Sequence, residues 1–272
     1  MSSKEKALPR LPVPFVLVTG GKGGVGKTTL AANLAVQLAR EGRRVLAVDL
    51  DLGLANLHVA LGLASEYSLE DALLGERALE DCVAEGPEGV HVLPAGSGTE
   101  TMGRLDDEMR ARFVAQLCDL ALEYDVVVGD SAAGIGPDVL GFAAIADRVL
   151  VVTTPEIAAL TDAYGLIKSL DQYGTRTDND IPTPEVVVNM APGLEEARRI
   201  AHRLRGVCER FLTRSPRAAG WLPKSRKVVQ SWETCVPFAS SKDQNSLESH
   251  CLGQIAERVQ RMGMSPTFAI QP

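Results

Sequence analysis

A glycine-rich segment, GGKGGVGKTT at residues 20–29, constrains this chain more than any other part of its sequence. It lies between an apolar run at 15–19 and an amphipathic segment that begins LAANLAVQLAR. Glycines let backbone N–H groups converge on phosphate oxygens, and the dipole of a following helix adds to the attraction. The spacing GxxxxGK[ST] between a strand and a helix therefore predicts a phosphate-binding loop.

The polar residues of this loop have predicted roles. Lys27 would bridge the β- and γ-phosphates, the Thr28 hydroxyl would ligate Mg²⁺, and Thr29 would reach the α-phosphate. The expected nucleotide contacts are Gly21, Gly23, Gly24, Val25, Gly26, Lys27, Thr28 and Thr29. The motif by itself leaves the second lysine of the segment, Lys22, without a role.

Short β-branched runs alternate with helical segments along the rest of the chain. The expected strands are 15–19, 44–49, 90–96, 124–130, 148–154, 185–189 and 218–223. Nearly continuous apolar strands separated by helices indicate a parallel sheet that is covered on both faces. The expected fold is therefore α/β, a doubly wound and mostly parallel sheet with helices on both faces.

Two expected helices carry apolar stripes at helical spacing. The stripe of the helix at 195–212 consists of Ile200, Leu204, Val207, Cys208 and Phe211. The stripe of the last helix, at about 243–262, consists of Leu247, Cys251, Leu252, Ile255, Val259 and Met262. The polar segment 171–185 is expected to be a surface connection.

Carboxylates end two of the expected strands. Asp130 ends the run YDVVVGD and is the predicted Mg²⁺ ligand beside Thr28, and the small residues SAAGIG that follow suit a segment that responds to a γ-phosphate. Asp49 and Asp51 end the second strand, where a carboxylate can orient water or contact magnesium. For Asp49 alone, hydrogen bonding within a turn is an equal alternative.

Composition excludes several classes of protein. With 272 residues, 45% of them hydrophobic, the chain can bury a large core, and we expect one domain. Its net charge of −7 disfavours general coating of nucleic acid. No run approaches the roughly 18 uninterrupted apolar residues of a membrane span. The five cysteines form no CxxC pair, so we expect reduced thiols in a cytoplasmic protein.

Several segments together resemble the MinD/ParA family of deviant Walker ATPases, from about residue 15 to 262. They are the glycine loop, VLAVDLDLGLANL, DSAAGIG, VTTPEIAALTDAYGLIK and VVVNM. The resemblance is greatest to the branch of flagellar-number regulators called FlhG or FleN. It implies a MinD-like P-loop ATPase domain at 15–262, an N-terminal extension at 1–14 and a C-terminal tail at 263–272.

The resemblance supplies a role for Lys22, which matches the signature lysine that crosses to the phosphates of the partner's nucleotide in an ATP-bound dimer. Asp51 matches the aspartate that positions the attacking water, so Lys22, Lys27 and Asp51 are the candidate catalytic residues. Glu156 matches a glutamate that touches the partner's ribose. Asp162 matches the aspartate that holds the signature lysine when ATP is absent.

Two further positions match family contacts with the base of the nucleotide. Asn189 matches an adenine-recognising asparagine, and the LPKS turn around Pro223 would line the base pocket. His58 stands where the family has a carboxylate, and a solvent-facing histidine is favoured over a pH-sensing one. The cofactors that the resemblance implies are ATP and Mg²⁺.

The implied function is an ATP-dependent dimerisation switch with slow ATP hydrolysis, which positions or counts a cellular structure such as a flagellum or a division site. A ParA-like ATPase that binds the nucleoid is an alternative. A metal-cluster carrier is disfavoured because no cysteine comes directly after DSAAGIG, and no feature names a substrate for a biosynthetic ligase. We expect a cytoplasmic homodimer, polar or nucleoid-associated, with a protein partner that the sequence does not identify.

Residues 198–227 form a basic stretch, with ten arginines or lysines and one acidic residue, Glu209. A solvated surface is the favoured interpretation. The alternative is contact with DNA without sequence preference, or with anionic lipid head groups. The residues that would make this contact are Arg198, Arg199, Arg203, Arg226 and Lys227. Stable membrane anchoring through the tail is not expected, since it lacks a basic amphipathic helix.

Overall fold

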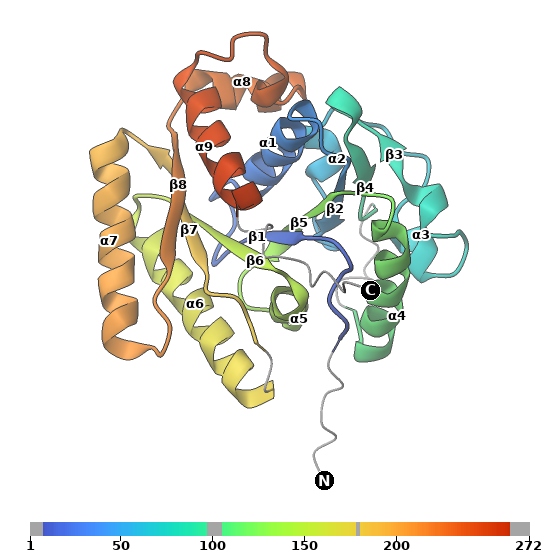
Figure 1. Cartoon of the computed structure of the whole chain (residues 1–272), viewed down its shortest axis with the longest axis horizontal. Helices are drawn as coiled ribbons and strands as arrows, with labels where there is room; N and C mark the ends of the chain where they lie inside the picture. The colour runs from blue at the N-terminus through green and yellow to red at the C-terminus, as the bar shows by residue number, and fades with distance from the viewer. Residues whose placement is uncertain (1–7, 97–104, 178–179, 262–272) are drawn as a thin grey trace, which may run out of the picture.

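The computed structural model describes residues 8–96, 105–177 and 180–261, and within them the strands form one eight-stranded sheet (Figure 1). The order across the sheet is β3-β4-β2-β5-β1-β6-β7-β8. The strands are β1 (Phe15–Gly20), β2 (Val45–Leu50), β3 (Ala84–Glu85), β4 (His91–Leu93), β5 (Val126–Ala133), β6 (Arg148–Thr153), β7 (Glu185–Ala191) and β8 (Arg217–Pro223). Neighbouring strands are parallel except for β3, which pairs antiparallel with β4 at one edge.

Helices cover both faces of this sheet. They are α1 (Lys27–Arg40), α2 (Leu57–Ala60), α3 (Leu69–Leu73), α4 (Asp107–Ala121), α5 (Pro137–Ile145), α6 (Ile157–Thr177), α7 (Leu194–Phe211), α8 (Arg226–Thr234) and α9 (Leu247–Arg261). In Figure 1, α1, α8 and α9 lie on one side of the sheet, and α4, α5, α6 and α7 lie on the other. The prediction of a doubly wound, mostly parallel α/β fold is confirmed.

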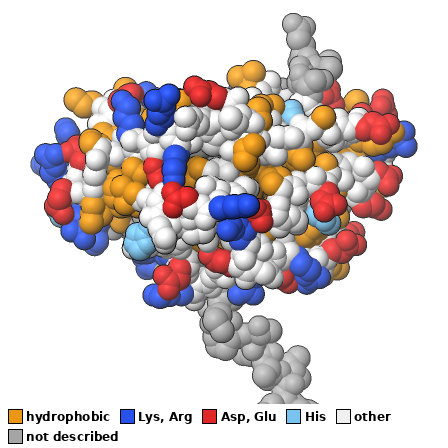
Figure 2. All heavy atoms as spheres, turned by 90° about the horizontal axis from the view of Figure 1, so that it is seen from above, with side chains coloured by type: hydrophobic (Ala, Val, Ile, Leu, Met, Phe, Trp, Pro, Cys, Tyr) orange, Lys and Arg blue, Asp and Glu red, His pale blue; other side chains and the backbone are white. Residues whose placement is uncertain are grey.

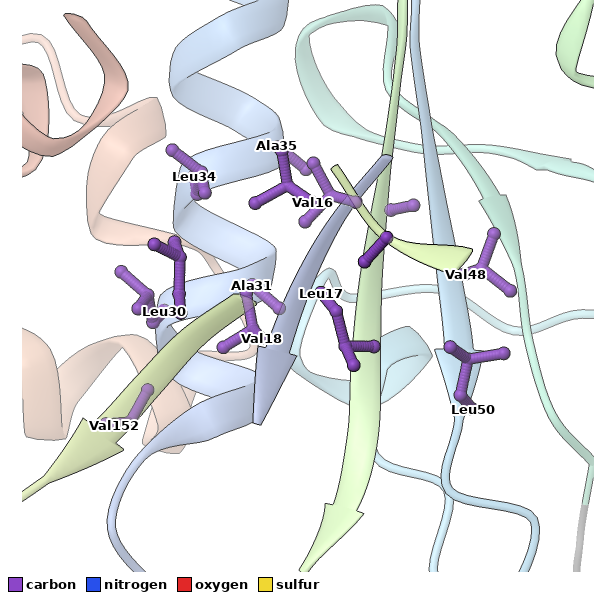
Figure 3. Packing of buried hydrophobic residues seen from close by; sticks show 14 of the residues in the cluster. Val16, Leu17, Val18, Leu30, Ala31, Leu34, Ala35, Val48, Leu50 and Val152 are labelled. Carbon is purple, nitrogen blue, oxygen red and sulfur yellow. The ribbon is translucent and has the colours of Figure 1, made fainter. Parts of the chain in front are cut away.

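The core lies where α1 packs against the central strands. Every residue of β1 is buried, as expected of a strand that is covered on both faces. Ala31 and Ala35 of α1 are wholly buried and lie beside Val18 and Val16 of β1, whereas Leu30 and Leu34, also wholly buried, lie on the other side of the helix (Figure 3). Burying one leucine side chain contributes about 2 kcal/mol, so burial on both sides fixes the helix that follows the glycine loop.

Several expected element limits need correction. β5 continues three residues beyond Asp130, to Ala133. α6 extends to Thr177, so the first half of the segment 171–185 is helical, because Leu170 and Gly174 continue its buried stripe. β4 ends at Leu93, and β3 was missed because two residues carry too short a pattern to detect.

The two predicted apolar stripes are only partly correct. On α7, Val207 and Phe211 are 38% and 64% exposed, because the buried stripe is narrower and Phe211 is the last residue of the helix. The Arg210 guanidinium lies 5.5 Å from the Phe211 ring centre and partly covers it. On α9, Leu247 is the first residue and is 52% exposed. Met262 lies outside the described residues.

Candidate nucleotide site

The glycine loop joins the end of β1 to the start of α1, with Gly26 as the N-cap in the left-handed region (φ 92°). A Cβ at Gly26 would lie 2.1 Å from Nδ2 of Asn189, and a Cβ at Gly21 would lie 2.1 Å from the backbone oxygen of Asp162. Both distances are far below van der Waals contact. Packing therefore requires glycine at these two positions, and their contact with a phosphate stays a prediction.

Asn189, near the end of β7, is hydrogen-bonded to the glycine loop. Its Nδ2 donates to the Val25 carbonyl at 2.8 Å, and its Oδ1 accepts from the backbone N–H of Met190 at 2.8 Å. The side chain is buried, so these bonds fix the shape of the loop. Its contact with adenine stays a prediction. Pro223, the last residue of β8, is buried beside Ala191 of β7, and its contact with the base also stays a prediction.

Asp130, the predicted magnesium ligand, lies on β5 between β1 and β2. The strand register places it beside Val18 of β1 and Asp49 of β2, and it is 2% exposed. Burial raises the pKa of Asp130 to about 8 and the Asp49 carboxylate adds to this, whereas a hydrogen bond with Thr28 and the charge of Lys27 lower it. Its Oδ1 has no hydrogen-bond partner among the described residues.

This donor set suits a divalent cation. An orphaned, buried carboxylate oxygen beside a hydroxyl is the oxygen environment that Mg²⁺ prefers. Thr28 and Asp130 would hold the ion, and a bound Mg²⁺ would neutralise phosphate charge. The hydroxyls of Thr19, Thr153 and Thr154, at the ends of β1 and β6, are also buried and unpartnered within the described part of the chain. The carboxyl end of the sheet is thus short of polar partners, which favours a polar ligand.

Asp49 and Asp51 have different surroundings. Asp49 is wholly buried and accepts hydrogen bonds from the backbone N–H groups of Asp51, Asn56 and Leu57, each at 3.0 Å. Burial raises the pKa of Asp49 to about 6, and these bonds oppose the shift. Asp49 therefore fixes the turn after β2. Asp51 is partly exposed, and its Oδ1 accepts from the Leu54 N–H at 3.1 Å, so it is the carboxylate that water can reach.

Lys22 points away from its own loop toward Glu156. Its Nζ lies 3.1 Å from Oε2 of Glu156, and the two side chains are 32% and 71% exposed. This differs from the expectation that Asp162 holds this lysine, because Asp162 approaches the loop through its backbone carbonyl, at Gly21. An exposed ion pair contributes at most about 1 kcal/mol, so Lys22 is weakly held.

Two contacts of Thr29 were missed by sequence reasoning. The indole N–H of Trp232 on α8 donates to the Thr29 hydroxyl at 2.7 Å, and Nδ2 of Asn33 donates to the Thr29 carbonyl at 2.8 Å. The buried Asn33 in an apolar helix was a usable signal, since buried amides are generally hydrogen-bonded. No local spacing relates Trp232 to Thr29, 203 residues away.

The predicted cationic set is divided between two parts of the molecule. Arg198, Arg199 and Arg203 lie on α7, whereas Arg226 and Lys227 begin α8, at the top of Figure 1. Three of the five form ion pairs with acidic residues that lie outside the stretch 198–227, so the charge count over that stretch did not include them. These ion pairs are Arg198 with Glu195, Arg199 with Glu196, and Lys227 with Asp243. Figure 2 shows blue and red side chains side by side on the face seen from above.

His58 is half-buried rather than solvent-facing. Its Nδ1 has no hydrogen-bond partner among the described residues, and burial lowers the pKa of the imidazole. The side chain lines a cavity of about 1050 Å³ beside the turn after β2. The residues that line this cavity include none of the glycine loop.

Comparison with known proteins agrees with this geometry. The CobQ/CobB/MinD/ParA nucleotide binding domain matches residues 16–234. The antiactivator FleN of Pseudomonas aeruginosa is 42% identical over 222 residues, which cover 80% of this chain and 78% of FleN. The flagellum site-determining protein YlxH of Helicobacter pylori is 39% identical over 155 residues, which cover 57% of this chain and about half of YlxH (52%).

A solved structure extends the comparison to the bound nucleotide. MinD of Pyrococcus horikoshii, complexed with Mg-ADP, superimposes with a TM-score of 0.70 at 25% identity, covering 93% of this chain and 98% of that one. This chain therefore belongs to the CobQ/CobB/MinD/ParA family of nucleotide-binding domains. It is a P-loop ATPase with ATP and Mg²⁺ as cofactors, of the kind of regulator that FleN and MinD represent. No helix of the described residues is long and apolar enough to cross a membrane.

Proposed function

We propose that this ATPase is a dimerisation switch, in which ATP joins two copies and slow hydrolysis separates them, and that it positions or counts a flagellum. The similarity to FleN and to a flagellum site-determining protein supports the flagellar role over a role at the division site. The geometry that carries the switch is the placement of Lys22. It lies within the glycine loop but pairs with an exposed carboxylate outside it.

The switch follows from the contrast between the two lysines. Lys27 is 8% exposed and begins α1, so it serves the nucleotide of its own chain. Among the described residues, Lys22 forms an ion pair only with Glu156, and a partner's phosphate is a stronger counter-charge than one exposed carboxylate. Dimerisation would then exchange the Glu156 pair for a phosphate contact. Asp51, which water can reach, would orient the attacking water.

Light scattering after size-exclusion chromatography tests this switch. We expect wild type to dimerise with ATP but not with ADP, and Lys22→Ala to bind ATP yet stay monomeric. Asp51→Ala should form a dimer that persists, because hydrolysis is blocked. Lys242→Ala, the matched control, removes an exposed lysine outside the glycine loop and should dimerise as wild type does. If Lys22→Ala dimerises with ATP as wild type does, Lys22 does not act across the dimer.

We propose a solvated surface for the predicted cationic set, because three of its members have acidic partners. The alternative, contact with DNA or anionic lipid, now depends mainly on Arg203 and Arg226. If each subunit neutralised ~2 phosphates, DNA binding by the dimer would show a log–log salt slope of about −4. A mobility shift that needs ATP and disappears in Arg203→Glu/Arg226→Glu would establish DNA contact.

We further propose that the protein acts in the cytoplasm, at a cell pole or on the nucleoid, with a protein partner still to be identified. The polar location follows from the flagellar role and the nucleoid location from the DNA alternative. A fluorescent fusion distinguishes them, because a polar focus that Lys22→Ala disperses would support the flagellar switch. Uniform fluorescence in the wild type would contradict both locations.

A further inference from the structure

The hydrogen bond between Trp232 and Thr29 joins a late helix of the chain to the nucleotide loop. Thr29 is 5% exposed and follows the predicted magnesium ligand on α1. Trp232 is half-buried on α8, on the same helical face as Val228, so α8 turns this side toward the body of the protein. The bond, at 2.7 Å, is at the short end of the normal range for an N–H···O hydrogen bond.

This bond belongs to a row of contacts along one face of α1. Oδ1 of Asn33, one turn after Thr29, accepts from the backbone N–H of Ala239 at 2.9 Å. Arg40, near the end of α1, donates to the carbonyls of Ala239 and Ser241. The segment from α8 through the short 3₁₀ helix Phe238–Ser240 is thus tied to α1 at three levels. These contacts between the segment and α1 fix the position of Trp232.

The chemistry of a hydroxyl makes the donor important. A threonine hydroxyl has one proton to donate and two lone pairs that accept. Because Trp232 can only donate, its N–H occupies a lone pair of Thr29 and leaves the hydroxyl proton free for an acceptor. A phosphate oxygen is such an acceptor. Without Trp232, the hydroxyl of Thr29 can rotate and offer its proton elsewhere, for example to a carbonyl of its own helix.

We propose that Trp232 is a positioning residue for nucleotide binding, which orients the Thr29 hydroxyl toward the α-phosphate. The proposal rests on the proposed role of Thr29. ATP and ADP share the α-phosphate, so Trp232 supports both equally and does not distinguish the two states of the switch. It therefore contributes to binding before and after hydrolysis alike, and not to the chemical step.

Substitution of Trp232→Phe removes the N–H and keeps an aromatic ring. We expect calorimetry to show weaker binding of ATP and of ADP by the same factor, about threefold to tenfold, the range of one hydrogen bond. KM should rise by a similar factor with kcat unchanged, as for an interaction present in both ground and transition states. Trp221→Phe, the matched control on β8, should leave both affinities unchanged.

Thr29→Val distinguishes a failure of the proposed role of Thr29 from a failure of the proposed role of Trp232. If Thr29→Val weakens ATP and ADP binding and Trp232→Phe adds nothing in that background, the two residues act as one unit, as we propose. If Thr29→Val binds both nucleotides like wild type, the role of Thr29 is wrong. If Thr29→Val weakens binding while Trp232→Phe alone does not, Trp232 is not a positioning residue. Losses that add in the double variant indicate that Trp232 acts only through general stability, and also overturn the proposal.

A second measurement leaves Trp232 intact. The chain has two tryptophans, so Trp221→Phe retains Trp232 as the only one. We expect its emission to change when Mg-ATP or Mg-ADP binds, with the same change for both, and to stay constant with either nucleotide once Thr29→Val is added. Unchanged emission in the Trp221→Phe protein at saturating ATP would overturn the proposal.

Discussion

Two clusters of buried charged residues differ in how completely their charges are paired. One lies near the amino ends of the parallel strands and the other near their carboxyl ends. Near the amino ends of β6 and β7, Glu185 is 5% exposed and pairs with Arg148 on one side and Arg258 on the other. Near the carboxyl ends of β2 and β5, Asp49 and Asp130 lie side by side, and one Asp130 oxygen has no partner among the described residues.

The difference in pairing indicates that the first cluster stabilises the fold and that the second binds a ligand. Arg148 also donates to the carbonyls of Arg258 and Val259, so the first cluster ties α9 to the sheet and needs nothing further. The second cluster brings two carboxylates together at a cost, which a bound cation would offset. We infer that a buried cluster in which every charge is paired serves to connect elements of the fold. A buried cluster in which a charged group lacks a partner is instead a ligand site. Four substitutions test this contrast.

The largest effect is expected from Lys27→Ala. The loop would lose its one buried cation, and ATP affinity should fall by more than about a hundredfold, because charge-assisted bonds to phosphate are the strongest in such a site. Isothermal titration calorimetry measures the loss, with Lys22→Ala as the control that keeps wild-type affinity. Retained affinity in Lys27→Ala would mean that the unpaired cluster is not the phosphate site.

Glu185→Gln should cost the most stability. It leaves the guanidinium of Arg148 buried without a counter-charge, a change that typically costs about 3–5 kcal/mol. Arg258→Gln, whose side chain is 37% exposed, is the milder control and should cost about 1 kcal/mol. Urea denaturation gives both free energies of unfolding. Equal losses in the two variants would show that burial does not decide the effect.

Asp130→Asn should act in the opposite way on stability. It removes one of two adjacent buried carboxylates, so the nucleotide-free protein in EDTA should gain about 1 kcal/mol, a rise in Tm of about 2–4 °C. Magnesium-dependent ATP hydrolysis should nevertheless be lost. Scanning calorimetry and an ATPase assay measure the two effects. A clear fall in Tm would indicate that Asp130 is a structural partner, like Glu185.

The smallest effect is expected from Glu209→Gln. Its pair with Arg205 on α7 is as short as a buried one, at 2.7 Å, but the two side chains are 48% and 57% exposed. A surface pair of this spacing contributes about 0.3–0.5 kcal/mol and weakens with salt. Urea denaturation at low and high salt checks this value. A loss near that of Glu185→Gln would refute the view that burial, and not pairing alone, sets the energy.

Most of the fold was predictable, because its signals are local. Apolar runs such as 148–154 alternate with amphipathic segments, and each pattern lies within one element. Two of the errors, at β5 and α6, occurred where the sequence pattern ends before the element does. β5 passes Asp130 because its backbone stays paired with β1 as far as Gly20 and Ala133, and α6 extends through Asp171, a polar residue that a sequence pattern assigns to a loop.

The candidate site was predictable for the loop and less so for its surroundings. The positions of Lys27, Thr28 and Asp130 followed from spacing and strand ends. The partner of Lys22 did not, because a long side chain can reach several carboxylates and only the placement of the segment before α6 selects Glu156. The same limit applies to the basic stretch, whose charge was counted within a window of sequence that excluded its acidic partners.

The sequence by itself determined the phosphate loop and the parallel sheet around it, because both depend on steric and apolar patterns within about ten consecutive residues. The tertiary structure alone decided which charges are paired and which are left unpartnered. Asp49 and Asp130 resemble each other as aspartates at the ends of apolar runs, yet Asp49 fixes a turn and Asp130 keeps one oxygen without a hydrogen-bond partner in the described part of the chain. Trp232 meets Thr29 only because α8 packs beside α1. Such contacts join residues far apart in the chain, and no local pattern encodes them.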